Sequence, residues 1–340
     1  MNLDVSVLMP VYLETLSVEN VRRMRIALES VFEQRFPGEL EVIIVDDGSP
    51  IKISDFEAVF RSLPRNSIRW IRYDRNYGIV HALNAGLRKA KHSLIARIDA
   101  DDQWCAGKIE KQCNLFLNDL DLTIVGTGMT RISPNQEIID ELIRPGDWRG
   151  ILRFFVEIGS PFPHGSVIGR RDIYHLLGGY PHDLIYKHCE DYALWGMWLR
   201  FFKPAIIEES LYKYTVSLNS LSAQNSNTQA ESSKGVREKF RWLESAASLP
   251  GAVDALSNCL GISTLQAGVL SLRMWRSQTP IFLPREAIAP LQTILSDRIV
   301  ECVNGDYTQS AIEMKHLLYG FDHGSEIFEH FSSVLVARSY

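Results

Sequence analysis

The sequence predicts an α/β protein in which a mostly parallel sheet is flanked by helices and followed by an all-helical C-terminal region. Strand and helix signals alternate through residues 1–130. The strand signals are continuous apolar runs, which is typical of parallel strands covered by helices on both faces. From residue 236 onward the signals are helical, with breaks at prolines. With 46% hydrophobic and 23% charged residues over 340 positions, the chain can bury a substantial core.

The expected elements follow one another in chain order. The first strand ends near Pro10, and the segment 18–34 then repeats apolar residues at helical spacing. The second strand is apolar and β-branched, and it stops at the pair Asp46-Asp47. The next elements are expected as a strand and turn over 67–78, a helix over 80–90, a strand over 92–102, a helix over 108–119 and a strand over 122–129.

The second part of the chain is less regular. A helix over 187–202 and a strand over 206–216 are expected within residues 131–220. Residues 221–235 are polar and rich in Ser, Asn and Gln, which favours a linker or mobile loop. We therefore expect a large domain over 1–220, this linker, and a helical region over 236–340.

Charge and cysteine content narrow the classes of protein. The net charge of −5 gives no overall basic footprint, so nucleic acid is not an expected partner. Five cysteines without a CxxC pair suggest neither a disulfide framework nor a zinc site, which favours a reducing cytoplasm. The N-terminal sequence has no basic segment of a signal peptide, and no apolar run is long enough for a membrane helix. A peripheral contact at the inner face of the cell membrane remains an alternative.

Carboxylates follow two of the predicted strands at the point where each strand ends. Ligands of parallel sheets bind at the carboxyl ends of the strands, so Pro10, Asp46-Asp47 and the cluster Asp99-Ala100-Asp101-Asp102 should gather at one edge. Crowded carboxylates suit a divalent cation, and hard oxygen ligands favour Mg²⁺ or Mn²⁺. The alternative is a solvated acidic turn in which Asp102 caps the helix that begins near residue 106.

Other polar residues also have two interpretations. Asp46-Asp47 could bind a base or ribose, or could order a tight turn. Asn76 and Gly78 form a turn, and Asn84 on the next helix could bind a ligand or local backbone. His164 could contact a ligand or phosphate, although a lone histidine is more often a structural hydrogen-bonding group.

The pair Glu190-Asp191 lies at a helix start, where the helix dipole favours an ionised carboxylate. A positioned, ionised carboxylate can act as a general base. Acidic residues in a first turn are also ordinary helix stabilisers.

The order of these motifs is more specific than any of them alone. The chain resembles the family-2 glycosyltransferases, which have the A-type glycosyltransferase fold, and the resemblance covers roughly residues 3–220. It is carried by the strand end Pro10-Val11-Tyr12, V-D-D-G-S at 45–49, N-x-G-x-x-x-A-x-N-x-G at 76–86, D-A-D-D at 99–102, P-H-G-S at 163–166 and E-D-Y-A-L-W at 190–195.

The resemblance implies a catalytic domain over 1–220 that binds a nucleotide-sugar, usually a UDP-sugar. It implies that Asp191 is the base, and that Asp99 and Asp101 contact the ribose and the metal-bound diphosphate, with Asp102 as an extra ligand. The metal would be Mn²⁺ or Mg²⁺. The residues implied or suggested for the nucleotide-sugar are Pro10, Tyr12, Asp46, Asp47, Asn76, Gly78, Asn84, Asp99, Ala100, Asp101, His164 and Glu190.

The activity implied by the resemblance is inverting transfer of a sugar to a hydroxyl of a glycan or lipid-linked acceptor in surface polysaccharide synthesis. One base and one stabiliser of the leaving group require no covalent sugar–enzyme intermediate. The alternatives are a non-catalytic relative that binds nucleotide-sugar or a partner protein, and a nucleotidyltransferase or oxidoreductase. Against the last two classes, neither a G-x-G-x-x-G motif nor a phosphate loop follows the first strand of this sequence.

Two positions depart from the family pattern. Leu83 stands where many relatives have an Arg that reaches phosphate. Thr215 and Ser217 stand where many relatives have an Arg and a His after the base helix, so His164 or the loop 215–225 would have to replace a metal contact.

The region 236–340 matches no motif. Its segments 236–246 and 270–278 place basic residues beside Trp and Phe. They fit an interfacial helix on anionic lipid, a bundle packed on the catalytic domain, or a dimer surface. Packing is favoured, because this mixture is common on ordinary helices.

Overall fold

The computed structural model describes residues 3–51, 63–64, 67–216, 226–239, 257 and 262–277. The strands are β1 (Val5–Val11), β2 (Leu40–Asp46), β3 (Ile68–Arg72), β4 (Leu94–Arg97), β5 (Gln103–Trp104), β6 (Leu122–Ile132), β7 (Ile138–Leu142), β8 (Ile168–Arg170) and β9 (Lys203–Thr215). The helices are α1 (Val18–Phe32), α3 (Ile79–Lys89), α4 (Lys108–Asn118), α5 (Trp148–Glu157), α6 (Arg171–Leu177), α7 (Glu190–Phe201), α9 (Ser226–Lys239) and α11 (Thr264–Ser277), with short 3-10 turns η2 (His164–Ser166) and η3 (Leu184–Tyr186).

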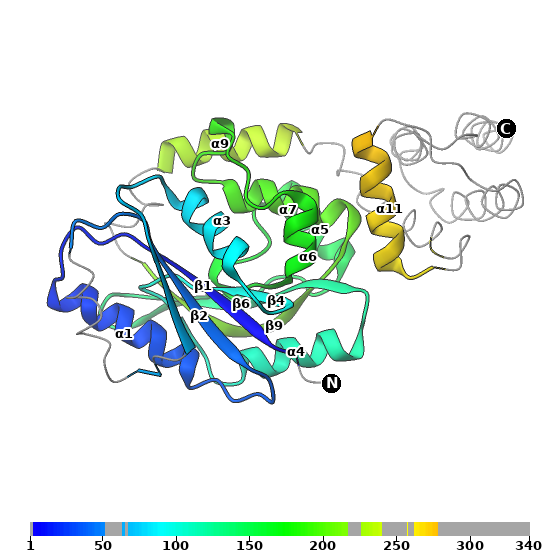
Figure 1. Cartoon of the computed structure of the whole chain (residues 1–340). Helices are drawn as coiled ribbons and strands as arrows, with labels where there is room; N and C mark the ends of the chain where they lie inside the picture. Colours follow the sequence, from blue (N-terminus) through cyan, green and yellow to red (C-terminus); the bar gives the residue numbers. More distant parts are fainter. Residues whose placement is uncertain are drawn as a thin grey trace, which may run out of the picture.

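The strands form one mixed sheet in the order β3-β2-β1-β4-β8-β6-β9-β5, and β7 pairs with β6 (Figure 1). The first half, β3-β2-β1-β4, is parallel, as the strand–helix alternation predicts. In the second half β8 runs antiparallel to both β4 and β6, whereas β6 and β9 are parallel. The predicted mostly parallel sheet is therefore confirmed for the part that precedes the D-A-D-D segment, and it becomes mixed beyond it.

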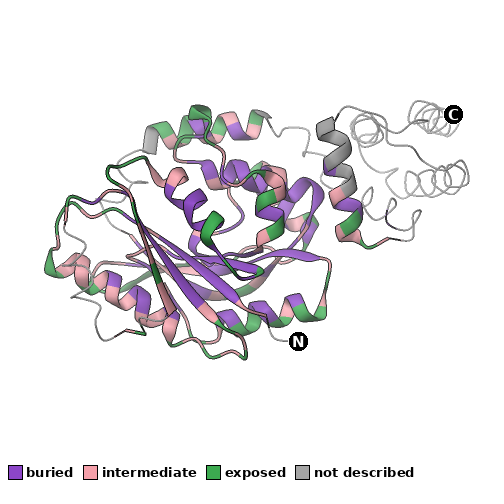
Figure 2. Ribbon diagram, viewed as in Figure 1, coloured by how far each residue is buried: buried purple, intermediate pink, exposed green. Residues whose placement is uncertain are grey.

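Helices cover both faces of the sheet, which explains the continuous apolar runs. Alternate residues of a strand point to opposite faces. On β1, Leu8 packs in the core beneath α3, α5, α6 and α7, while Val7 and Met9 pack in the core on the side of α1 and α4. Figure 2 shows the central strands buried along most of their length between these two helix layers.

The carboxyl ends of the parallel strands lie in register. Val11, the last residue of β1, pairs with Asp46 of β2, and Asp46 pairs with Arg72 of β3. Arg97 ends β4 and pairs with Leu8. The turns that carry the predicted site residues therefore leave the sheet along a common edge.

The polar segment predicted as a linker differs from the expectation, because α9 already begins at Ser226. Its Val236 is buried against the core that contains α7, and the thiol of Cys189 is 3.1 Å from the hydroxyl of Ser233. Polar residues here form a helix because one side packs on the catalytic domain.

The helix α11 also packs on the catalytic domain. Ala267 and Leu272 are buried, and the amide of Leu265 donates to Asp121 Oδ1 at 2.9 Å. At Gly268 a Cβ would lie only 2.2 Å from the carbonyl oxygen of Phe201, so the helix approaches the end of α7 too closely for a larger residue. This contact agrees with the packing interpretation for the segment up to Ser277. Residues 278–340 lie outside the described part of the chain.

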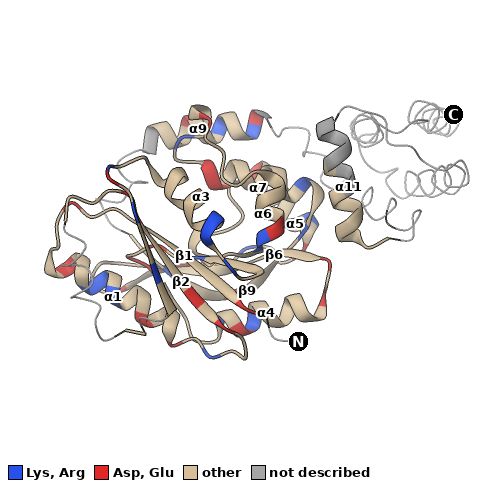
Figure 3. Cartoon of the chain, viewed as in Figure 1, with Lys and Arg blue, Asp and Glu red and all other residues tan. Residues whose placement is uncertain are grey.

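Two further properties of the described elements are the distribution of their charges and the length of their apolar segments. Figure 3 shows Lys and Arg interspersed with Asp and Glu along the elements. None of the helices in the described ranges is long and apolar enough to cross a membrane.

Lys108 is a buried lysine at the start of α4 and allows a test of the packing. Its ammonium donates to Gln112 Oε1 at 2.8 Å and lies 4.3 Å from the centre of the Trp104 ring. Burial lowers the pKa of Lys108 to about 7. In the unfolded chain the same group titrates near ~10.4. Between these values the unfolded chain binds more protons, so this lysine costs more stability as the pH falls.

We therefore expect Lys108→Met to gain in melting temperature relative to the unmodified protein as the pH is lowered from 10 to 7. The lost hydrogen bond to Gln112 costs about 1–3 kcal/mol at every pH. Thermal unfolding of both proteins across this pH range measures the difference. A melting-temperature difference that does not change with pH would contradict a lysine buried with a lowered pKa.

Candidate active site

The D-A-D-D segment forms a tight turn between β4 and β5. The amide of Ile98 donates to the carbonyl of Leu8 at 3.1 Å and continues the pairing with β1. The amide of Asp102 then donates back to the carbonyl of Asp99 at 3.3 Å. The chain reverses here, so the side chains of the turn emerge at the edge where β1 ends.

Asp102 is a buried anchor of this turn. The hydroxyl of Tyr212 donates to its Oδ2, and the amide of Thr215 donates to its Oδ1 at 2.8 Å. Burial raises the pKa of Asp102 well above its usual range. Thr215 also donates from Oγ1 to the carbonyl of Asp101 at 2.5 Å. Both oxygens of Asp102 accept hydrogen bonds within the protein and only 1% of the residue is exposed, which favours an anchoring role over the expected role as an additional metal ligand. Asp102 does not cap α4, whose N-cap is Gly107.

Removal of the Tyr212 hydroxyl should loosen this anchor. We expect Tyr212→Phe to lower the free energy of unfolding by about 1–3 kcal/mol, because a buried acceptor of Asp102 loses its donor. Urea unfolding followed by circular dichroism measures the change. A loss below about 0.5 kcal/mol, the usual range for surface substitutions, would show that β9 does not hold the turn through this bond.

Arg97 is a buried cation that the sequence analysis passed over. It ends β4 with only 4% of its surface exposed. Its Nη1 donates to Asp99 Oδ2 at 2.5 Å, and its Nη2 donates to Asp99 Oδ1. The signal was present in the sequence, because a charged residue inside an apolar strand is almost never buried without a partner.

Asp101 is the carboxylate of the turn whose oxygens are available to a ligand. No other described residue donates a hydrogen bond to its side chain, in contrast to Asp99 and Asp102. Burial and the negative charge of Asp99 raise the pKa of Asp101 to about 6. A cation beside these two carboxylates would relieve their repulsion, so the donor set fits a divalent cation held by one or two protein carboxylates.

Within the described ranges, no group of three or more His, Cys, Asp or Glu side chains is arranged to hold a metal. Among the carboxylates of the turn, Asp101 is the one that would contribute to the coordination shell of such a cation. Magnesium sites of this kind complete the shell with substrate phosphates and water.

The acidic pair Glu190-Asp191 forms the first turn of α7. Burial and the charge of Asp191 raise the pKa of Glu190 to about 7. Burial also raises the pKa of Asp191, while hydrogen bonding from the Tyr192 amide and the positive charge of Arg97 oppose this rise. The Tyr192 amide lies 2.8 Å from Asp191 Oδ1. The second oxygen of Asp191 has no hydrogen bond from a described residue.

His164 connects α7 to the segment before it. Its Nδ1 lies 3.9 Å from Asp191 Oδ2, and its Nε2 is 2.9 Å from the hydroxyl of Tyr180. Burial and the nearby charge of Arg97 hold the pKa of His164 well below its usual range, so the ring is neutral at pH 7. A neutral His164 is a hydrogen-bonding group at the edge of the site.

The aspartates at the end of β2 make hydrogen bonds within the turn region. Asp46 is fully buried, and its oxygens accept from the Ser49 amide at 2.9 Å and from Arg72 Nη1 at 2.8 Å. Asp47 accepts from the amides of Tyr77 at 3.0 Å and Gly78 at 2.7 Å. In this structure both carboxylates therefore make the contacts of the turn interpretation: Asp46 holds its own turn and Arg72 of β3, and Asp47 positions the loop that begins α3.

The two asparagines also make internal bonds. Asn76 accepts from the Gly78 amide at 3.0 Å and orders its own turn. Asn84 is buried on α3, where it donates to the carbonyl of Tyr180 and accepts from the amide of the same residue, both at 2.9 Å. Asn84 thus fastens the loop after α6 to α3, and Leu83 beside it is buried in the core.

The remaining predicted residues are accessible at the edge of the sheet. Tyr12 follows β1 directly and is 44% exposed, and Pro10 and Ala100 are partly buried. The segment η2, which carries His164, packs against β4, the strand that leads into the D-A-D-D turn, and His164 Nδ1 lies 3.9 Å from Asp191 on α7. The structure therefore brings the acidic turn, the start of α7 and His164 into one region, while Asp46, Asp47, Asn76 and Asn84 make hydrogen bonds within the loops around it.

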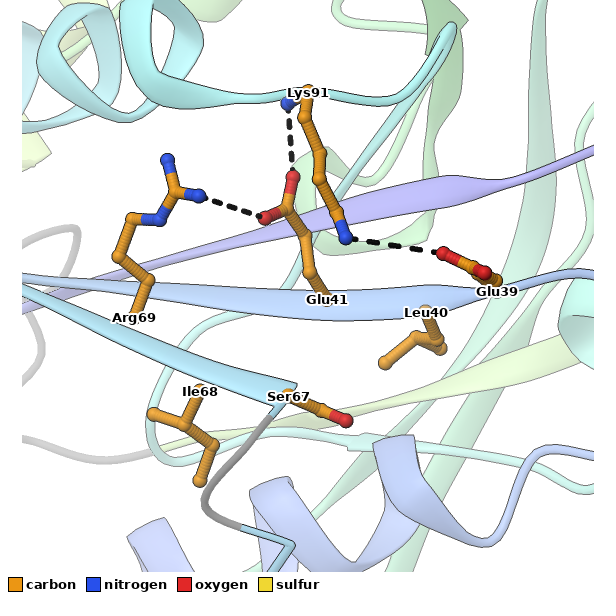
Figure 4. A pocket seen from close by; sticks show the side chains of 7 residues that line it. All are labelled: Glu39, Leu40, Glu41, Ser67, Ile68, Arg69 and Lys91. Atoms are coloured by element: carbon orange, nitrogen blue, oxygen red, sulfur yellow. Dashed lines mark hydrogen bonds and ion pairs between the residues drawn. The ribbon is translucent and has the colours of Figure 1, made fainter.

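A crevice of about 560 Å³ lies at the opposite ends of β2 and β3 (Figure 4). Glu41 there lies 3.8 Å from Arg69, and Glu39 lies 3.8 Å from Lys91. Its acidic and basic side chains pair with one another, and the amino ends of parallel strands are not where such sheets bind ligands. We assign the crevice no part in the site.

Comparisons with known proteins agree with the geometry. The amylovoran biosynthesis glycosyltransferase AmsE of Erwinia amylovora is 27% identical over 185 residues, which cover 52% of this chain and 64% of that protein. The UDP-Gal:alpha-D-GlcNAc-diphosphoundecaprenol beta-1,3-galactosyltransferase of Escherichia coli is 28% identical over 200 residues, which cover 56% of this chain and 66% of that protein. The chain thus spans just under two thirds of each relative.

The fold has solved counterparts as well. The crystal structure of S. aureus TarS 1-349 in complex with UDP-GlcNAc has a TM-score of 0.50 at 15% identity, covering 99% of this chain and 91% of that one. The predicted A-type glycosyltransferase fold is confirmed. The family model described as glycosyl transferase family 2 matches residues 6–177, half of the chain. The chain therefore belongs to glycosyl transferase family 2.

Proposed function

We propose that this protein transfers a sugar from a nucleotide-sugar to a hydroxyl of a glycan or lipid-linked acceptor in surface polysaccharide synthesis, with inversion at the anomeric carbon. One observation carries the proposal: Asp191 Oδ2 lies 3.9 Å from His164 in η2, a segment that packs against β4, the strand that leads into the turn of Asp99 and Asp101. The names of the two curated relatives, which refer to polysaccharide synthesis and to a UDP-sugar, support a UDP-sugar as the donor.

The donor would bind across the ends of β1 and β4. Tyr12 is exposed at the end of β1 and offers a ring face to a nucleobase. Asp99, which Arg97 orients, would accept a hydrogen bond from a ribose hydroxyl. Asp101 would hold a Mn²⁺ or Mg²⁺ ion against the diphosphate. When bound, such a cation neutralises the charge that develops on the departing nucleotide diphosphate.

Asp191 is proposed as the general base. It would accept the proton of the acceptor hydroxyl through Oδ2, the oxygen that faces His164. Its Oδ1 is already held by the Tyr192 amide, so the orientation of the carboxylate is fixed. The acceptor oxygen attacks the anomeric carbon from the side opposite the leaving diphosphate. A single displacement of this kind inverts the configuration and needs no protein nucleophile.

A panel of nucleotide-sugars tests the proposal. The full chain is incubated with UDP-, GDP- and dTDP-sugars in the presence of Mn²⁺ or Mg²⁺, and the released nucleotide is measured. We expect release from at least one donor, with the largest rate for a UDP-sugar, and loss of release when EDTA removes the cation. Binding of a nucleotide-sugar without release from any donor, with acceptors supplied, would support the non-catalytic alternative.

A further inference from the structure

Arg97 occupies a position where the surrounding sequence calls for an apolar residue. Its neighbours Leu94, Ile95, Ala96 and Ile98 are all buried and apolar. Arg97 itself has only 4% of its surface exposed. Burial of a cation without compensating charge costs several kcal/mol, so its presence at the end of β4 requires a charged partner. An apolar side chain would serve the strand equally well.

The guanidinium of Arg97 donates hydrogen bonds to one carboxylate and interacts electrostatically with others. Its fork holds both oxygens of Asp99, and its buried Nε has no hydrogen-bond partner in the described part of the chain. The start of α7 lies close to β4, because Asp191 Oδ2 is 3.9 Å from His164 in η2 and η2 packs against this strand, and the positive charge of Arg97 favours the ionised form of Asp191. One cation thus serves carboxylates that come from two separate elements, the turn after β4 and the start of α7.

The groups around Asp191 come from every element near it. Glu190 lies on the same helix, His164 is in η2, Tyr180 follows α6, and Asp99 follows β4. All of these are acidic or neutral at pH 7, because burial keeps the pKa of His164 low. On α9, Arg237 interacts with Tyr192 and Cys189. Among these groups Arg97 is the cation that acts on Asp191.

We propose that Arg97 is a positioning residue of the transferase site: its fork fixes Asp99 toward the donor, and its charge is the built-in counter-ion that holds the acidic turn and the Glu190-Asp191 pair together in one desolvated site. The inference rests on the proposed function and assigns a role within that site. Its two parts are separable, because the fork depends on guanidinium geometry and the counter-ion role depends only on positive charge.

Three variants separate the parts. Arg97→Lys keeps the charge and loses the two-pronged bond to Asp99. Arg97→Met removes both and keeps an unbranched apolar stem. Arg200→Met is the matched control, because Arg200 is also 4% exposed but lies at the far end of α7, about 13.5 Å along the helix from Asp191. The readouts are donor KM, kcat, the pH dependence of kcat, and the melting temperature.

We expect Arg97→Lys to raise the donor KM about tenfold with kcat within about threefold, because Asp99 loses its fixed orientation. Arg97→Met should lower kcat/KM by about 100-fold or more and shift the acid limb of kcat to higher pH, because Asp191 loses the cation that favours its ionised form. Arg200→Met should lower the melting temperature while leaving KM and the acid limb unchanged.

Each other outcome overturns a stated part. Unchanged kcat/KM and pH profile in a folded Arg97→Met would overturn the inference while the unmodified protein remains active. Equal losses in Arg97→Lys and Arg97→Met with an unshifted acid limb would overturn the counter-ion role. If Arg97→Met does not fold, Arg97→Lys alone decides, since an unchanged donor KM would overturn the fork. Absence of nucleotide release by the unmodified protein would instead contradict the proposed function.

Discussion

Replacement of Asp191 by Asn is expected to lower kcat by about 10³-fold and to leave donor binding nearly unchanged. The substitution keeps the size of the side chain and an oxygen that can accept from the Tyr192 amide, the bond that now measures 2.8 Å. It removes the charge that would accept the proton of the acceptor hydroxyl. The effect should therefore fall on the chemical step, because the proposed donor contacts at Tyr12, Asp99 and Asp101 are left unchanged.

Nucleotide release and calorimetric donor binding, measured on the same preparation, check this expectation. Glu190→Gln is the matched control, because it neutralises the adjacent carboxyl group on the same helix turn, and its effect should be smaller. Normal turnover in Asp191→Asn would rule out the base assignment. Loss of donor binding in the same variant would place Asp191 in the donor site instead.

The pH dependence of activity is a second test of Asp191 as the base. Burial raises the pKa of Asp191 above the ordinary value of 3.8. A base must be ionised, so activity should fall as the pH drops through this raised pKa, which lies at a higher pH than for an exposed aspartate. The acid limb should disappear from the residual activity of Asp191→Asn.

Replacement of Asp101 by Asn should lower kcat/KM by about 100-fold, equivalent to about 2.7 kcal/mol, and should weaken the effect of Mn²⁺ on donor binding. Asp101 is the carboxylate of the turn without a described hydrogen-bond partner from another residue, and its pKa is raised to about 6. The substitution removes the charge on which a divalent cation depends and leaves the anchor at Asp102 intact.

Calorimetric titration of UDP with and without Mn²⁺ measures this effect directly. Asp140→Asn is a suitable control. Asp140 lies on the surface strand β7 and pairs with Arg131 of β6, so its replacement should not alter the manganese dependence. If Asp101→Asn binds UDP with the same manganese dependence as the unmodified protein, the metal assignment is wrong.

Much of the parallel half of the sheet was predictable from apolar runs. The runs ending at Pro10-Val11, Asp46 and Arg97 are buried on both faces, and such runs predict parallel strands with their carboxyl ends at one edge. The mixed half of the sheet was harder to predict from the sequence, because β8 has only three residues and β5 only two. Their pairing depends on β4, β6 and β9, which are distant in sequence.

The roles of individual acidic residues were only partly predictable. Motif spacing indicates which turn carries a carboxylate, and it does not indicate which neighbour the carboxylate meets. Asp102 and Asp46 look like Asp101 in sequence, yet they accept hydrogen bonds from Thr215 and Arg72, respectively. Those partners come from segments that spacing within a motif cannot reach.

The residues around the cluster divide the chain into two contiguous blocks. The proposed donor residues, Tyr12 to Asp101, lie before α4, whereas His164 and Asp191 lie after β6. The blocks are joined by the pairing of β4 with β8 and of β5 with β9, and by side-chain bonds that include Asn84–Tyr180 and Asp102–Thr215. This arrangement is modular: a chimera that exchanges the later block with that of a relative would keep the donor half intact, provided that it retains this seam. Recombination at such a seam offers a route by which one donor could be directed to new acceptors.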